Sequence, residues 1–206
     1  MKFRNPLALR DAPDPFVTYD PVTGYYYALF TRGRVLELFR SRHAANIITD
    51  GDSKVIYTPD GERDGIWGDI WAPEMHRGSN GKWYVYTSGR IKPEPSQKRL
   101  FIMEGPADDP FEGEWIFRGK PSPDIFSIDP TVYTAPDGAQ WGMVGDESGW
   151  ICLADWSLVY DSREFLKDHE TECVPFEGES AAEIPATEEK PVIAWSYPGG
   201  DRAKYT

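Results

Sequence analysis

A motif that recurs at intervals of nearly sixty residues is the strongest constraint on the fold of this chain. Each copy centres on a proline that opens a short run of β-forming residues, and the steps between these prolines are 73 − 15 = 58 and 130 − 73 = 57 residues. Such a repeat indicates a fold built from similar units that pack against their neighbours. The copies are Asp14-Pro15-Phe16-Val17, Ala72-Pro73-Glu74-Met75 and Asp129-Pro130-Thr131-Val132.

Each unit contains several strand signals separated by turn signals. The turn after the first strand contains Gly or Asn, residues that tolerate positive φ in a hairpin. The expected strands are 14–19, 25–30, 35–39 and 54–57 in the first unit, 72–76, 82–86, 100–103 and 115–117 in the second, and 129–133, 140–144 and 150–153 in the third. Four short strands per unit are typical of a propeller blade, so the sequence predicts an all-β propeller.

We expect residues 1–206 to form one incomplete propeller domain of about three and a half blades. Propellers usually have 4 to 8 blades, and an open blade edge exposes unpaired backbone groups, so oligomers that pair through this edge are expected. The predicted blades are about 10–60, about 68–120, about 126–174 and a partial fourth at about 175–206, the last with its second strand at 190–195.

The charge of the chain restricts its partners. Acidic residues exceed basic ones by 34 − 22 = 12, a balance that repels nucleic acid and anionic lipid, so neither is expected as a partner. Residues 1–6 do not begin an apolar secretory signal, and no run of about 18 apolar residues could span a bilayer, so we expect a cytoplasmic protein. Cys152 and Cys173 form no metal-binding pattern and are expected to be thiols.

The starts of the first strands should converge, because the innermost strand of every blade lines the central channel of a propeller. Asp14 and Asp129 occupy equivalent points in the first and third units, and Glu177 occupies such a point in the fourth. Trp71 and Glu74 flank the matching point of the second unit. Several carboxylates around one pocket are what glycoside hydrolysis requires, although a single Asp-Pro pair would more often be a turn former.

Three ordered segments resemble the blade-start motifs of glycoside hydrolase family 43. They are 5–16, 71–76 and 126–132, and the resemblance covers roughly residues 5–178. It implies a five-bladed β-propeller that hydrolyses arabinose- or xylose-containing plant saccharides with inversion at the anomeric carbon.

The resemblance also implies three catalytic carboxylates. Asp14 would be the general base, Asp129 would orient the acid and keep its pKa high, and Glu177 would be the general acid. Glu177-Gly178 is followed by Glu179 where the family motif has proline. Rivals for the acid are Glu172, Glu179 and Glu183, and Asp11 is a rival to Asp14.

Three further residues are expected to contact the sugar. Trp71 and Phe126 would form an apolar floor, and His76 would donate a hydrogen bond or help to hold a central ion or water, although core packing explains each as well. No metal ligands are assigned and no cofactor is required, while a structural calcium or other ion in the channel stays open. The segments 50–53 and 60–62 lack EF-hand spacing and are interpreted as turns.

The favoured function is cleavage of terminal or internal α-L-arabinofuranosyl linkages in arabinan- or arabinoxylan-derived saccharides. A β-xylosidase of the same family would use the same carboxylates and is the first alternative. The second is a catalytically inactive sugar-binding propeller fragment, which would keep Trp71 and Phe126 without needing all three carboxylates.

Overall fold

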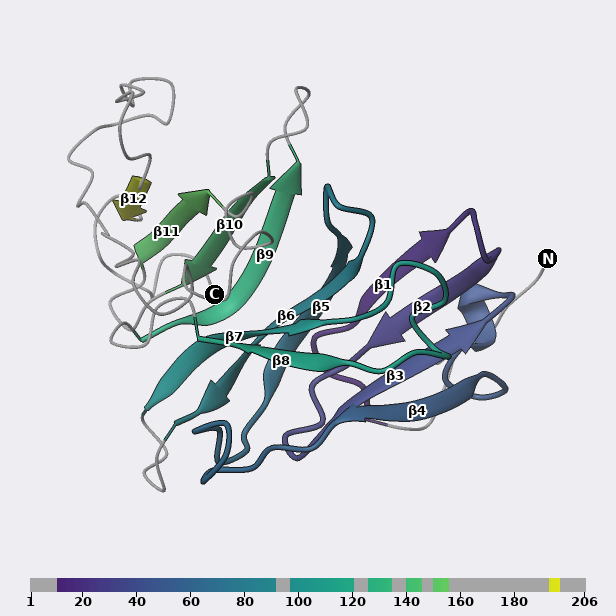
Figure 1. Ribbon diagram of the computed structural model, residues 1–206, viewed down its shortest axis with the longest axis horizontal. Coiled ribbons are helices and arrows are strands. Elements are labelled where there is room, and N and C mark those ends of the chain that lie inside the picture. The colour runs from purple at the N-terminus through teal and green to yellow at the C-terminus, as the bar shows by residue number, and fades with distance from the viewer. Residues whose placement is uncertain are drawn as a thin grey trace.

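The computed structural model describes residues 11–91, 97–120, 126–134, 140–145, 150–155 and 193–196. In this part of the chain, twelve strands form three antiparallel four-stranded sheets, which lie side by side as the blades of a β-propeller (Figure 1). No helix in these ranges is long and apolar enough to cross a membrane.

Each blade is a meander in which consecutive strands pair. Blade 1 contains β1 (Phe16–Asp20), β2 (Tyr25–Leu29), β3 (Leu36–Ser41) and β4 (Asp52–Tyr57), with the short 3-10 helix η1 (Ala44–Asn46) before β4. Blade 2 contains β5 (Trp71–Arg77), β6 (Trp83–Arg90), β7 (Lys98–Glu104) and β8 (Ile116–Gly119). Blade 3 contains β9 (Ile128–Thr134), β10 (Gln140–Gly145), β11 (Trp150–Asp155) and β12 (Ile193–Ser196).

The strand predictions are confirmed for β1 to β11, and β12 is a correction. The segment 190–195 was expected to be the second strand of a fourth blade. Instead, β12 pairs with β11 as the outermost strand of the third sheet, with Trp195 opposite Ile151. No fourth strand was expected in the third unit, and spacing alone placed this segment in the next unit. The blade boundaries themselves stay a prediction.

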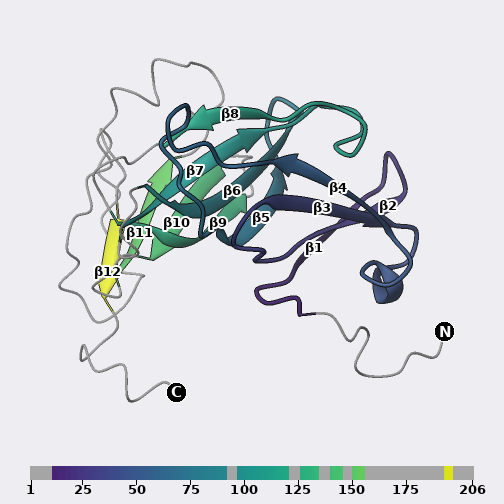
Figure 2. The same cartoon turned by 90° about the horizontal axis from the view of Figure 1, so that it is seen from below.

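Blade 2 lies between blades 1 and 3, and its first strand contacts the first strands of both (Figure 2). Apolar side chains from blades 1 and 2 form the main core described, and burying each such side chain contributes roughly 1.5–3 kcal/mol. Its members include Tyr27, Leu29, Leu36, Leu38, Ile66, Ile70, Met75, Val85, Phe101 and Met103.

Polar contacts fix the orientation of blade 1 on blade 2. The buried carboxylate of Asp20 caps its own turn by accepting the Val22 and Thr23 N–H groups at 3.2 and 3.1 Å. It also lies 3.3 Å from Arg77 Nη1 in blade 2. The hydroxyl of Tyr27 donates to Asp109 at 2.9 Å. These directional bonds add geometric specificity to an otherwise apolar interface.

Glu104, at the end of β7, is a buried carboxylate that accepts hydrogen bonds from three residues. Lys82 Nζ donates to Oε1 at 2.7 Å, while Arg118 Nε and the Tyr84 hydroxyl donate to Oε2 at 2.8 and 3.1 Å. Burial acts to raise the pKa of Glu104, but the hydrogen bonds from Lys82 and Arg118 prevail and hold it below its usual value of 4.5.

We expect Glu104→Gln to lower the free energy of unfolding at neutral pH by about 2 kcal/mol, because hydrogen bonds to a charged group contribute roughly 1.5–3 kcal/mol. A lowered folded-state pKa stabilises the protein above the unfolded-state value, and this stabilisation is lost as the pH falls through the folded-state pKa. Urea denaturation should therefore show a smaller difference between variant and wild type at about pH 4 than at about pH 7. Exposed Glu114, replaced by Gln, is the matched control. A difference that does not depend on pH would contradict this account.

Candidate functional site

The starts of the three first strands share an unusual backbone conformation. Asp14, Ala72 and Asp129 each precede a proline, and their φ angles are 51°, 42° and 51°. Positive φ is uncommon for any residue other than glycine, and a residue before proline is normally extended. In blade 2 the strand pairing also shifts register between Trp71 and Glu74, around this point. The sequence repeat is thus a repeat of strained backbone, a feature that clusters at functional sites.

The candidate site is built from four residues at or beside these strand starts: Asp14, Thr31, Trp71 and Asp129. Asp14 is exposed just before β1, and its Oδ2 accepts a 2.6 Å hydrogen bond from the Thr31 hydroxyl. The Thr31 Oγ1 in turn accepts the N–H of Ala72 in blade 2 at 2.7 Å. The carboxylate of blade 1 is therefore linked through one hydroxyl to the start of blade 2.

Asp129, near the start of β9, contributes the second carboxylate. Its side chain is accessible to solvent, yet it lies among enough protein atoms that partial loss of hydration raises its pKa. The negative charge of Asp14 raises the pKa of Asp129 further. Because this charge effect acts between blades 1 and 3, the structure brings the two predicted carboxylates into one electrostatic environment.

Trp71 begins β5 and remains 42% exposed. Lys98 Nζ lies 3.6 Å from the centroid of its ring and donates a hydrogen bond to the Asp69 carbonyl at 3.0 Å. Lys98 is only 2% exposed, and this burial lowers the pKa of its amine. One face of the indole thus rests on a buried amine, and the ring keeps enough exposed surface to stack against a sugar.

The other predicted residues have different surroundings. Phe126 is half-buried, two residues before β9. His76 Nε2 lies 2.8 Å from Glu74 Oε2, and its ring packs 5.1 Å from the ring of Phe16, so it takes part in the contact between blades 1 and 2. Glu177 lies outside the described residues, as do its rivals Glu172, Glu179 and Glu183.

Sequence reasoning missed Thr31 and Lys98. A signal existed for Thr31, because extending the β1–β2 register, in which Phe16 faces Leu29, by two residues places Thr31 opposite Asp14. Lys98 follows a stretch rich in proline and polar residues, and nothing in that pattern indicates that its side chain is buried.

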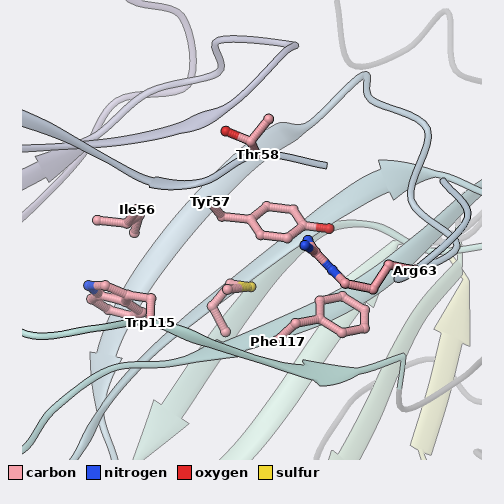
Figure 3. A pocket seen from close by; sticks show the side chains of 7 residues that line it. Ile56, Tyr57, Thr58, Arg63, Trp115 and Phe117 are labelled. Atoms are coloured by element: carbon pink, nitrogen blue, oxygen red, sulfur yellow. The ribbon is translucent and has the colours of Figure 1, made fainter. Parts of the chain in front are cut away.

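A separate pocket of about 360 Å³ lies between the outer strands β4 and β8 (Figure 3). The Tyr57 ring stacks at 6.0 Å from that of Phe117, and its hydroxyl donates to Asp64. The residues that line this pocket are Ile56, Tyr57, Thr58, Arg63, Met103, Trp115 and Phe117. None of them is a predicted site residue. Within the described ranges, no group of three His, Cys, Asp or Glu side chains is arranged to hold a metal ion.

Comparison with known proteins places these features in a family. Residues 3–180 match the model of glycosyl hydrolases family 43. An extracellular exo-alpha-(1->5)-L-arabinofuranosidase of Streptomyces chartreusis is 33% identical over 136 residues, which are 64% of this chain and 40% of that protein. Alpha-L-arabinofuranosidase B of Pyricularia oryzae is 26% identical over 133 residues, 63% of this chain and 26% of that protein.

Solved structures agree with the fold. The alpha-L-arabinofuranosidase of Lactobacillus brevis superimposes with a TM-score of 0.63 and 25% identity, over 73% of this chain and 50% of that one. An endo-arabinase of Bacteroides thetaiotaomicron gives a TM-score of 0.59 at 15% identity, over 80% of this chain and 56% of that one, which supports the fold alone. The chain spans about half the length of these two solved structures. It spans 40% or less of the length of the two curated relatives. With its repeated blade starts, paired aspartates and matched family model, the chain belongs to glycosyl hydrolase family 43.

Proposed function

We propose that this protein is a glycoside hydrolase that cleaves α-L-arabinofuranosyl linkages in arabinan- or arabinoxylan-derived saccharides, with inversion at the anomeric carbon. The observation that carries the proposal is the pair Asp14 and Asp129, held at equivalent strained positions and close enough for their charges to interact. The arabinofuranosidase names of the relatives support arabinose as the sugar.

The proposed reaction needs three carboxyl groups and one water molecule. Asp14 accepts a proton from the water while the water oxygen bonds to the anomeric carbon. At the same time the glycosidic C–O bond breaks, and Glu177 protonates the departing oxygen. The water attacks from the face opposite the leaving group, so the configuration inverts. The two carboxyl groups of an inverting pair are usually about 6.5–9.5 Å apart, which leaves room for this water. Asp129 orients the acid and helps to keep it protonated.

Trp71 is proposed as the platform for the sugar ring. Its exposed face offers the apolar surface on which the C–H groups of a pentose can stack, and Lys98 beneath it restricts its orientation. Phe126 is proposed as a further part of the floor, and His76 as a hydrogen-bond donor oriented by Glu74. The strongly acidic chain is suited to a neutral saccharide.

The test is hydrolysis of 4-nitrophenyl α-L-arabinofuranoside and 4-nitrophenyl β-D-xyloside, by this chain and by a version extended to the five blades that the family resemblance implies. We expect faster cleavage of the arabinofuranoside, and proton NMR should show the β-anomer of arabinose as the first product. Faster cleavage of the xyloside would favour the β-xylosidase alternative. Saccharide binding without turnover in either form would favour a sugar-binding module.

A further inference from the structure

We propose that Thr31 is a positioning residue for the catalytic base: its hydroxyl holds Asp14 Oδ2 and leaves Oδ1 to receive the proton of the attacking water. This inference rests on the proposed function, because it assigns a role in the same reaction. Thr31 follows β2 and lies beside the start of β1, so it contacts Asp14 from just beyond the neighbouring strand of the same blade.

The direction of the hydroxyl proton follows from its two partners. The Ala72 N–H can only donate, so at 2.7 Å it uses a lone pair of the Thr31 oxygen. The single hydroxyl hydrogen is then available for Asp14 Oδ2, and an ionised carboxylate can only accept. The 2.6 Å separation falls in the range of charge-assisted O–H···O⁻ bonds. The Thr31 hydroxyl therefore donates to Oδ2 and holds the carboxylate of Asp14 in one orientation.

Thr31 also restrains the backbone around Asp14. Its N–H donates to the Pro13 carbonyl at 3.0 Å, so one residue holds both the segment before Asp14 and the Asp14 side chain. Asp14 has a φ of 51°, a conformation that persists only where neighbouring contacts impose it. Through Ala72, the same hydroxyl fixes the position of this carboxylate relative to blade 2, where Trp71 lies.

The two oxygens of Asp14 consequently differ. Oδ2 is occupied by Thr31, and among the described residues no hydrogen-bond donor contacts Oδ1. A base must be held within a fraction of an ångström of its working position, since a displacement of about 1 Å can cost roughly 10²-fold in rate. Thr31 supplies this restraint and selects which oxygen faces the water.

The experiment compares Thr31→Val, which keeps the shape of the side chain without its hydroxyl, with Thr31→Ser, which keeps the hydroxyl. Both are assayed in the form of the protein that hydrolyses 4-nitrophenyl α-L-arabinofuranoside, at a temperature where circular dichroism shows each variant folded. We expect Thr31→Val to lower kcat by about 10- to 100-fold with KM within about threefold of wild type, and Thr31→Ser to retain kcat within about threefold. Exposed Thr58, replaced by Val, is the control for loss of a threonine hydroxyl elsewhere.

Several results would overturn the inference. A Thr31→Val variant with the kcat of wild type, beside an inactive Asp14→Asn variant, would remove the role of Thr31 and leave the proposed function intact. Equal losses in Thr31→Val and Thr31→Ser would show sensitivity of the fold rather than a requirement for the hydroxyl. Absence of hydrolysis by the parent protein, or full activity of Asp14→Asn, would overturn the proposed function and this inference with it.

Discussion

Replacing Asp14 with asparagine is expected to lower kcat for arabinofuranoside hydrolysis by about 10³-fold, within the range that general-base catalysis supplies. Asparagine has nearly the same shape, and its carbonyl oxygen can still accept the hydrogen bond that Thr31 donates to Asp14. The substitution removes the capacity to take a proton from water, together with the negative charge of the carboxylate. The loss should therefore appear in kcat, while KM and the melting temperature stay close to those of wild type.

Asp11 provides the matched control for this prediction. It is exposed three residues before Asp14 and lacks the following proline, so Asp11→Asn should leave kcat within about twofold of wild type. Stopped assays with the 4-nitrophenyl substrate measure both variants under the same conditions. If Asp11→Asn were inactive and Asp14→Asn active, the base would have been assigned to the wrong aspartate.

The proline repeat was sufficient to predict β1 to β11, because period, turn residues and β-forming segments all indicated the same architecture. It also placed Asp14 and Asp129 at equivalent points, and the structure adds that both residues have the same positive φ. That conformation is not visible in the sequence, since aspartate before proline is ordinarily extended. The blade, with its pairing and packing, imposes it.

The failures of prediction have a common physical origin in contacts between distant segments. Lys98 reaches under Trp71 from another strand, and Thr31 joins Asp14 to Ala72 across two blades. Local patterns carry no information on such pairs unless a hairpin register connects them. The misassigned strand β12 pairs with β11 across a long stretch of sequence, so spacing alone could not reveal its partner.

Replacing Asp129 with asparagine is expected to lower kcat by about 10²-fold without destabilising the protein. Its proposed role is to orient the acid and raise the pKa of that acid by its charge, and asparagine keeps the shape but loses the charge. The measurements are kcat against pH and urea denaturation of the same variant. Exposed Asp108, replaced by Asn, controls for the loss of one negative charge from an acidic chain.

The stability of this variant follows from the raised pKa of Asp129, which has partial loss of hydration as its main cause and the charge of Asp14 as the second. A raised folded-state pKa means that the folded chain binds the proton more readily than the unfolded chain, whose value is near 3.8. Ionised Asp129 therefore lowers stability above its folded-state pKa, and this cost disappears as the pH falls through that pKa toward 3.8.

Asparagine removes the cost, so Asp129→Asn should be as stable as wild type or more stable at about pH 7, and the difference should vanish at low pH. Reduced activity together with undiminished stability would support the proposed catalytic role of Asp129. Reduced activity accompanied by lower stability at about pH 7 would instead mean that its charge is needed for folding, and the proposed catalytic role would fail.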